Sequence, residues 1–383
     1  MSQARYYAQI VGWGKYIPQT VLTNEDLTHV VDTSDEWIRT RTGIGERHAA
    51  SPKESSATMA ARAAEQALDV ANIDPLGIDL IIVATATPDY MFPATACLVQ
   101  DALGASKAGA FDLSAGCSGF VYALGMAADG IAAGTYSTAL VIGSETLTRV
   151  VDWSDRATCV LFGDGAGAVV LKASEAPCGV LATVLGADGS GADLLTLPGS
   201  GFKVPLSMEA RGAELPTIKM NGNEVYRFAT RTMGKVALQA VKKAGMTLEQ
   251  VDLVIPHQAN LRIIQAAAKS LKVPEEKVFV NLDRYGNTSA ASIPIALCEA
   301  AESGRIKDGN LIVLSAFGAG LTWGATVVRW QTVPVQARGN WLTRLVRWLR
   351  LRLAPVNSTY RRTARHVDSI VGEATGDREK PGE

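Results

Sequence analysis

The chain has 383 residues, 47% of them hydrophobic and 20% charged, and a formal net charge of −1. These values are typical of an ordinary globular protein with a large core, and the length favours two or three domains. Residues 331–383 hold ten Lys/Arg against five Asp/Glu, so residues 1–330 carry a net charge of −6, which argues against general nucleic-acid binding.

The five cysteines are scattered, and none forms a CxxC pair or has the Cys/His spacing of a zinc site. They are Cys97, Cys117, Cys159, Cys178 and Cys298. We therefore expect a reduced, cytoplasmic protein without a metal centre. The N-terminal segment does not resemble a signal peptide, and no apolar run has the length of a membrane span.

Strand and helix patterns alternate along the first half of the chain. The predicted strands cover residues 8–14, 79–85, 108–113 and 138–143, and the predicted helices cover residues 35–41, 55–71 and 93–103. This alternation predicts βαβ crossovers and a mostly parallel sheet that is covered on both faces, which is an α/β fold.

Cys117 follows the predicted strand at 108–113 through a turn of small residues, and a helical pattern begins directly after it. This arrangement places the sulfur at a helix N-terminus, where unpaired N–H groups and the positive end of the dipole favour the thiolate. The dipole lowers a thiol pKa by at most roughly 1.5 units from about 8.5, so we expect a pKa of about 7 for Cys117 and a further polar partner. The alternative is a small buried hydrophobe, the usual role of a free cysteine.

The same order of elements recurs about 170 residues later, which suggests a duplicated α/β unit. The matched pairs are residues 78–84 with 251–257, residues 140–144 with 311–315, and Cys117 with Asn287. A duplication would place Cys117, His257 and Asn287 at strand ends or helix starts of two pseudo-symmetric halves, where ligands gather in α/β sheets. Chance similarity between apolar strands is the alternative.

His257 is the one histidine that follows an apolar strand and opens a turn, whereas His29, His48 and His366 lie in charged segments or in the tail. Asn287 lies at another turn before a helical pattern. A buried structural histidine and a turn or N-cap asparagine are the ordinary alternatives. The order Cys, His, Asn also fits papain-like proteases, but their cysteine lies near the N-terminus in a different local motif.

The C-terminal region, residues 331–383, is interpreted as an appendage. Residues 331–339 form a linker with Pro and Gly, and residues 341–353 a short helix with leucines on one side and arginines on the other. Residues 341–365 contain seven arginines and no acid, a pattern typical of a helix that lies on a membrane surface or contacts a partner. The alternative is a helix packed on the body, with a disordered end from about Asp368.

Six segments together resemble the β-ketoacyl-acyl-carrier-protein synthase III family of the thiolase superfamily. They are Asp35-Glu-Trp-Ile-Arg-Thr-Arg-Thr-Gly43, Gly116-Cys-Ser-Gly-Phe120, Phe162-Gly-Asp-Gly-Ala-Gly167, His257-Gln-Ala-Asn-Leu-Arg-Ile263, Gly286-Asn-Thr-Ser289 and Phe317-Gly-Ala-Gly-Leu-Thr-Trp-Gly324. The resemblance covers about residues 5–330, and the tail extends beyond the point where this family usually ends.

The resemblance implies a thiolase-like fold with two pseudo-symmetric α/β halves in a five-layer α-β-α-β-α arrangement. Residues 1–175 would form the half with the nucleophilic cysteine, and residues 176–330 the half with the histidine and the asparagine. Residues 331–383 would add the linker, the basic amphipathic helix and a disordered tail. The resemblance further implies a homodimer.

The implied reaction is a decarboxylative Claisen condensation of an acyl-CoA primer with malonyl-acyl-carrier protein, which initiates fatty acid synthesis. Cys117 would hold the acyl group, while His257 and Asn287 would stabilise the enolate oxygen, at about 3–4 kcal/mol per donor. The backbone N–H groups of Cys117 and Ala319 would stabilise the first oxyanion. No cofactor is implied, because the CoA thioester and the carrier's phosphopantetheine enter as substrates.

The resemblance also implies binding roles. Trp37 and Arg156 would stack on the CoA adenine, and Arg41, Asn223 and Asn260 would make other CoA contacts. An acidic carrier protein would dock on Arg227, Arg262 and Lys269, and Phe92 would close the acyl pocket across the dimer. For each basic residue, a solvated surface position is the alternative.

The same residues are compatible with two alternative functions. One is a synthase III-like acyltransferase or condensing enzyme of a specialised, polyketide-type pathway. The other is a carrier-binding or membrane-scaffolding subunit, in which the polar residues would be idle. The length of the primer depends on three-dimensional packing and is not predicted.

Overall fold

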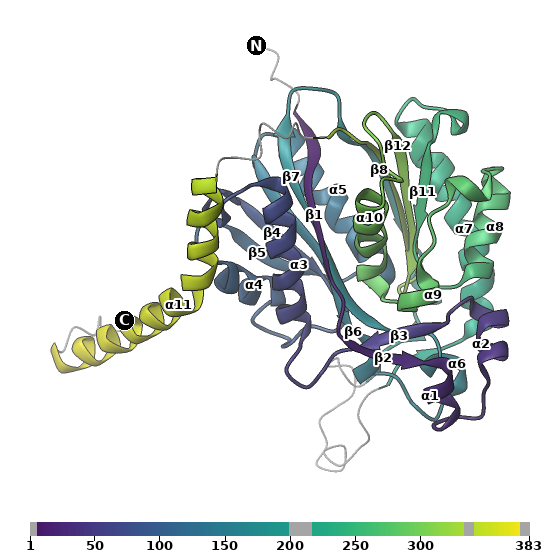
Figure 1. The fold of residues 1–383 in the computed structure, drawn as a ribbon, viewed down its shortest axis with the longest axis horizontal. Helices are drawn as coiled ribbons and strands as arrows, with labels where there is room; N and C mark the ends of the chain where they lie inside the picture. The colour runs from purple at the N-terminus through teal and green to yellow at the C-terminus, as the bar shows by residue number, and fades with distance from the viewer. Residues whose placement is uncertain (1–5, 199–216, 333–340, 376–383) are drawn as a thin grey trace, which may run out of the picture.

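The computed structural model describes residues 6–198, 217–332 and 341–375 (Figure 1). Nine strands form one sheet in the order β11-β12-β13-β8-β1-β7-β6-β4-β5. Their bounds are β1 (Tyr7–Tyr16), β4 (Leu80–Ala84), β5 (Gly109–Leu113), β6 (Thr138–Thr146), β7 (Asp164–Ser174), β8 (Gly179–Ala187), β11 (Leu253–Pro256), β12 (Leu311–Gly318) and β13 (Thr322–Arg329). Two small ribbons pair β2 (Thr20–Thr23) with β3 (Glu46–Ala49) and β9 (Leu195–Thr196) with β10 (Lys219–Met220).

The helices lie between and outside these strands. Their bounds are α1 (Asn24–Thr28), α2 (Asp35–Thr42), α3 (Ser56–Ala71), α4 (Thr95–Leu103), α5 (Gly119–Ala132), α6 (Arg156–Cys159), α7 (Gly222–Lys243), α8 (Leu261–Leu271), α9 (Leu282–Tyr285), α10 (Ser292–Glu302) and α11 (Trp341–Thr375). The helix starts follow local signals: the Ser55 side chain accepts from the Thr58 N–H and caps α3, and Ser34 caps α2.

The sheet consists of two halves in which four strands have the same topology, which confirms the predicted repeat. The fifth strand of the first half, β5, corresponds in the second half to a single parallel bridge between Val254 and Val278. In the first half, β4 is parallel to β6, and β7 and β1 follow antiparallel. In the second half, β11 is parallel to β12, and β13 and β8 follow antiparallel. The halves meet where β1 pairs with β8 at Ala8 and Val180.

The prediction of a mostly parallel sheet is wrong, because each half combines parallel with antiparallel pairs. Residues 319–321 alone join β12 to β13, and such a short connection makes an antiparallel pair, since a parallel pair needs a long crossover.

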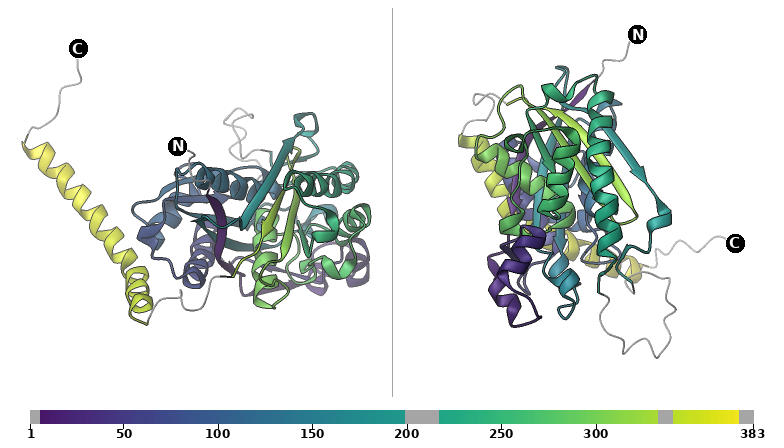
Figure 2. Two further views of the ribbon diagram at one scale, coloured as in Figure 1. Left: turned by 90° about the horizontal axis from the view of Figure 1, so that it is seen from above. Right: turned by 90° about the vertical axis from the view of Figure 1, so that its right-hand side faces the viewer.

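Three helical layers enclose the two halves of the sheet and complete the α-β-α-β-α arrangement (Figures 1 and 2). The central helices α5 and α10 share one apolar core with strands of both halves. α3 and α4 cover the first half, and α7 and α8 lie on the outer side of the second. Phe120, Val121, Leu124 and Ile131 of α5 are fully buried, as expected for a helix that is apolar on most of its sides.

The C-terminal helix differs from the prediction of a short helix followed by disorder from about Asp368. α11 runs from Trp341 to Thr375 and passes through Pro355, although proline removes one helical hydrogen bond. The predicted linker at 331–339 lies outside the described residues from 333 onward. Within the ranges that the structure describes, no helix is both long and apolar enough to cross a membrane.

Glu299 of α10 connects the central layer to neighbouring elements. Its carboxylate accepts hydrogen bonds from Arg284 Nη2 (2.7 Å), the Tyr285 hydroxyl (2.5 Å) and Asn281 Nδ2 (3.0 Å), and Lys15 Nζ of β1 lies 3.2 Å away. Burial opposes ionisation, but these bonds outweigh it and lower the pKa of Glu299 to about 2. The cluster therefore fixes the segment between α9 and α10.

We predict that Glu299→Gln lowers the free energy of unfolding at pH 7 by on the order of 3 kcal/mol. Because the folded-state pKa is lowered, this stabilisation is present above the ordinary pKa of 4.5 and is lost as pH falls toward about 2. Urea unfolding between pH 7 and pH 3 measures both effects. The half-exposed Glu302 provides the control Glu302→Gln, and equal losses in both variants would contradict the prediction.

Candidate active site

Cys117 lies where the sequence places it, between β5 and α5. A short 3₁₀ turn, Gly116–Ser118, joins the strand to the helix. Gly116 has φ +52°, and a Cβ there would lie 2.9 Å from the Ala319 backbone nitrogen; a Cβ at Gly318 would lie 2.6 Å from the Cys117 nitrogen. The loop after β12 therefore packs directly against the cysteine turn, and only glycine fits at either position.

The Cys117 thiol is buried, with 8% of the residue exposed. Burial raises the pKa of this thiol to about 11, and the nearby Glu145 carboxylate acts in the same direction. Hydrogen bonds from Ser289 and from the backbone N–H of Cys117 lower the pKa but do not outweigh burial. The expected pKa of about 7 is therefore wrong, because desolvation of the buried thiolate outweighs the effect of the helix terminus. The resting residue is a neutral thiol.

His257 directly follows β11, and its backbone N–H donates to the Ser315 carbonyl (2.8 Å). Nδ1 lies 2.7 Å from Ser292 Oγ, and Nε2 is buried without a hydrogen-bond partner among the described residues. The ring packs edge-on to Phe317, with 5.4 Å between ring centroids. Burial lowers the pKa of His257 to about 3, so the imidazole is neutral at pH 7.

The tautomer of His257 is assigned from the hydrogen bonds of its neighbour Ser292. Ser292 Oγ accepts a hydrogen bond from the Gln258 backbone N–H (3.4 Å), which leaves the Ser292 hydroxyl proton free to donate to Nδ1. This assignment places the imidazole proton on Nε2, the atom without a protein partner.

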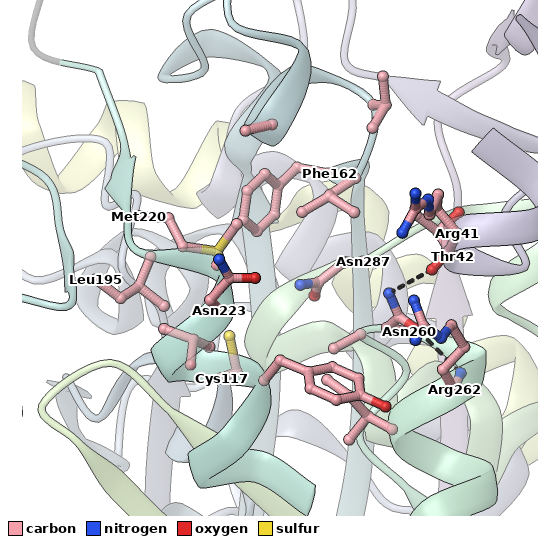
Figure 3. Close-up of a pocket in the computed structure, with 18 of the residues that line it drawn as sticks. Arg41, Thr42, Cys117, Phe162, Leu195, Met220, Asn223, Asn260, Arg262 and Asn287 are labelled. Atoms are coloured by element: carbon pink, nitrogen blue, oxygen red, sulfur yellow. Dashed lines mark hydrogen bonds between the residues drawn. The ribbon is translucent and has the colours of Figure 1, made fainter. Parts of the chain in front are cut away.

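Asn287 is held by its backbone and by one side of its amide. Its N–H donates to the Leu161 carbonyl (2.8 Å), and its carbonyl accepts from Gly163 N–H (3.1 Å). Oδ1 accepts from the Ser289 backbone N–H at 2.9 Å, which orients the Nδ2 donor group. Figure 3 shows the carboxamide of Asn287 and the sulfur of Cys117 directed into the same cavity.

This cavity has a volume of about 490 Å³ and is lined by side chains from both halves. The predicted site residues that line it are Trp37, Arg41, Cys117, Arg156, Asn223, His257, Asn260, Arg262 and Asn287. In its outer part the Arg156 guanidinium lies 4.8 Å from the centroid of the Trp37 ring. The three residues far apart in the chain thus share one chamber with the aromatic–guanidinium pair.

Asn260 connects the two sides of the cavity. Its Nδ2 donates to the Arg41 carbonyl (3.0 Å), and its Oδ1 caps α8 by accepting from Arg262 N–H (2.9 Å). Arg262, predicted for carrier docking, lines the cavity beside these residues (Figure 3). Both arginines make this part of the cavity cationic, which suits an anionic ligand.

The other predicted binding residues lie outside this cavity. Arg227 is exposed and pairs with Glu224 at 2.8 Å, and Lys269 is exposed on α8. Phe92 is 83% exposed. A second cavity of about 80 Å³ adjoins Cys117; its lining includes Leu147, Phe162 and Ala319 but not Phe92.

The sequence interpretation missed a buried polar group beside the cysteine. Glu145, at the end of β6, accepts hydrogen bonds from Thr87 Oγ1 (2.6 Å), Ala86 N–H (3.1 Å) and Ser289 Oγ (3.0 Å). Burial raises its pKa to about 7. Ser289, which also bonds the Cys117 thiol, has φ +47°, a strained value for serine. The available signal was an acid close behind the apolar run of residues 139–143.

In the part of the chain that the structure describes, no cluster of His, Cys, Asp or Glu could hold a metal ion. The site instead combines a thiol, a neutral imidazole donor, an amide donor and a cationic entrance. These groups suit acyl transfer through a cysteine, with hydrogen-bond donors for a developing oxyanion.

Comparisons with known proteins agree with this chemistry. Models described as 3-oxoacyl-[acyl-carrier-protein] synthase III and its C-terminal part match residues 111–189 and 241–330. The β-ketoacyl-[acyl-carrier-protein] synthase III of Desulfitobacterium hafniense is 55% identical over 321 residues, 84% of this chain and 97% of that protein. The enzyme of Caldanaerobacter subterraneus is 52% identical over 323 residues, 84% of this chain and 98% of its own length.

Solved structures show the same relationship. The 3-oxoacyl-[acyl-carrier-protein] synthase III from Aquifex aeolicus has a TM-score of 0.79 and 52% identity, and the match covers 84% of this chain and all of that one. The priming β-ketosynthase of the R1128 polyketide pathway has a TM-score of 0.81 and 36% identity, with 87% of this chain and 99% of that one covered.

The fold and the cysteine cavity define an acyl-transferring condensing enzyme with a thiolase-like fold. Within that class, the chain belongs to the β-ketoacyl-acyl-carrier-protein synthase III family, the condensing enzymes that initiate fatty acid synthesis.

We predict that alkylation of Cys117 by iodoacetamide accelerates about tenfold per pH unit between pH 7 and pH 9, because the thiolate is the reactive form. A pKa of about 11 keeps the thiolate a minor species throughout this range. Peptide mass spectrometry measures the rate, with Cys117→Ser as the control for modification elsewhere. A rate that levels off near pH 7 would instead support activation by the helix terminus.

Proposed function

We propose that this protein condenses an acyl-CoA primer with malonyl-acyl-carrier protein to give 3-ketoacyl-acyl-carrier protein. The observation that carries the proposal is the shared cavity, which Cys117, His257 and Asn287 line together with Trp37 and Arg156. CoA would enter with its adenine on the Trp37–Arg156 pair, and its thioester would reach Cys117. The reaction as proposed requires no cofactor.

In the first step, the Cys117 sulfur attacks the thioester carbon of the acyl-CoA. The backbone N–H groups of Cys117 and Ala319 stabilise the oxyanion, and the close contact between their loops supports this role. Positive φ among the described non-glycine residues occurs at Asn72, Lys272 and Ser289, so Ala319 needs no glycine conformation. The acyl group transfers to Cys117, and the proton of the thiol leaves with CoA.

In the second step, the malonyl thioester loses carbon dioxide and becomes an enolate. The N–H groups of His257 Nε2 and Asn287 Nδ2 donate hydrogen bonds to the enolate oxygen and stabilise it. Because both side chains are neutral, they stabilise the enolate without transferring a proton to it. The enolate carbon attacks the acyl thioester and expels Cys117, which takes one proton from solvent. That proton balances the loss of the carboxylate.

We also propose that the protein is a cytoplasmic homodimer. The outer edge of β5 ends the nine-stranded sheet, and Phe111 on that strand is 40% exposed. Tyr90, Met91 and Phe92 are exposed on a nearby loop, and such apolar groups beside an open edge suit pairing with a second copy. Five free cysteines support a reducing compartment.

A specialised pathway remains the second candidate. The 36% identity to the R1128 priming β-ketosynthase favours it, whereas the relatives at 52–55% identity favour fatty acid synthesis. Turnover with a panel of acyl-CoA primers of different length and branching distinguishes these functions.

We predict that Cys117→Ser abolishes formation of the acyl-enzyme, whereas His257→Ala and Asn287→Ala retain it. The latter variants should lose malonyl decarboxylation by about 10²–10³-fold, because each removes one donor to the enolate oxygen. Intact-protein mass spectrometry follows acylation, and release of labelled carbon dioxide follows decarboxylation. Full acylation of the Cys117 variant, or decarboxylation that survives in both other variants, would refute the assigned roles.

We predict that Trp37→Ala raises the KM for acyl-CoA about tenfold and changes kcat less than about twofold, since the ring stacks far from the reacting carbon. Trp348 of α11, whose ring centroid lies 5.6 Å from the Arg352 guanidinium carbon, offers a matched Trp–Arg pair outside the cavity. Trp348→Ala should leave both constants unchanged. The same KM for Trp37→Ala and the parent would contradict CoA binding at this pair.

A further inference from the structure

The helix α11 has no counterpart in the matched part of the family. The C-terminal family model ends at residue 330, and relatives are matched over 97–98% of their own length but over 84% of this chain. α11 begins at Trp341, beyond that region. Its role is therefore separate from the shared condensation chemistry.

One face of α11 is held on the body by polar contacts with α4 and its surroundings. Arg361 Nη2 lies 3.1 Å from Asp101 Oδ1, and the Ser358 hydroxyl donates to the same carboxylate. Arg350 pairs with Asp74, and Ala354 is 1% exposed. Arg350 and Arg361 thus face the protein, whereas Arg352 and Arg362 are exposed.

The opposite face of α11 carries an apolar stripe that the protein leaves uncovered. The stripe consists of Val346, Leu349, Leu353, Val356 and Tyr360, which recur every three or four residues and therefore share one face. Their exposed fractions are 44%, 43%, 50%, 61% and 74%. Single exposed leucines are common, but a continuous stripe of this length marks a contact surface.

The charge around the stripe restricts what covers it. Residues 341–365 contain seven arginines and no acid. Arg352 packs over Trp348 beside the stripe, and the Arg362 side chain is 71% exposed despite its contact with Asp101. A second copy of α11 would bring arginine against arginine, whereas an anionic lipid surface offers acyl chains to the stripe and phosphates to its flanks.

We propose that α11 binds in the plane of an anionic phospholipid bilayer, with the apolar stripe (Val346, Leu349, Leu353, Val356 and Tyr360) inserted at the interface. The docked face stays on α4 in this arrangement, so binding requires no change in the body. α11 lies at the β5 end of the molecule, opposite α2 and α8, which border the cavity (Figures 1 and 2). The cavity entrance therefore stays open to CoA and to the carrier protein.

The experiment compares full-length protein with the double variant Leu349→Gln/Leu353→Gln, which removes apolar surface, adds no charge and keeps good helix formers. The matched control is Val30→Gln/Val280→Gln, at two exposed apolar positions of the body (52% and 37%). Co-sedimentation uses vesicles of equal parts phosphatidylglycerol and phosphatidylcholine, and vesicles of phosphatidylcholine alone. Light scattering and turnover in solution are measured on every protein.

The parent and the control should bind the anionic vesicles, less so at high salt, and should not bind phosphatidylcholine alone. The α11 variant should partition about tenfold more weakly, with unchanged turnover and oligomeric state. Equal sedimentation of parent and α11 variant would overturn the proposal, as would absence of binding by the parent. A change of oligomeric state in the α11 variant, without vesicle binding by the parent, would identify a second copy as the occupant.

Discussion

Close backbone contact between the two halves around Cys117 is the constraint on which the site depends. A Cβ on Gly143 would lie 2.2 Å from the Ala290 carbonyl oxygen, and one on Gly318 would lie 2.6 Å from the Cys117 nitrogen. These contacts pack the turn before α10 on β6 and the turn before α5 on β12, so each central helix starts against a strand of the other half. The duplicated topology supplies the sulfur from one half and the imidazole and amide from the other, so the reactive groups meet only when both halves are folded and packed.

Desolvation determines the chemical state of these groups. Burial raises the pKa of the Cys117 thiol to about 11 and lowers that of His257 to about 3, so both rest in their neutral forms. Neutral donors suit a reaction in which negative charge develops on substrate oxygens, because the donors are already oriented and the imidazole does not compete as a cation. The cationic charge is kept at the entrance, on Arg41, Arg156 and Arg262, where anionic substrates arrive.

Much of the fold was predictable because its signals are local. The strand–turn–helix at Cys117 and the capped starts of α2 and α3 follow from neighbouring residues alone. Properties that depend on distant packing were not predictable in this way. The pKa of Cys117 depends on burial by both halves, Glu145 and Ser289 meet from opposite halves, and α11 continues past Pro355 while it packs on α4. The antiparallel strands were missed because alternating strands and helices do not specify every direction of pairing.

A crystal structure with CoA bound is the most direct test of the claim that one cavity joins substrate recognition to chemistry. The account predicts that the adenine stacks on the Trp37–Arg156 pair, and that the pantetheine arm ends at the Cys117 sulfur. His257 Nε2 and Asn287 Nδ2 should both lie within hydrogen-bond distance of an oxygen bound beyond that sulfur. CoA bound elsewhere, or His257 Nε2 turned away from the thiol end of the ligand, would contradict the account.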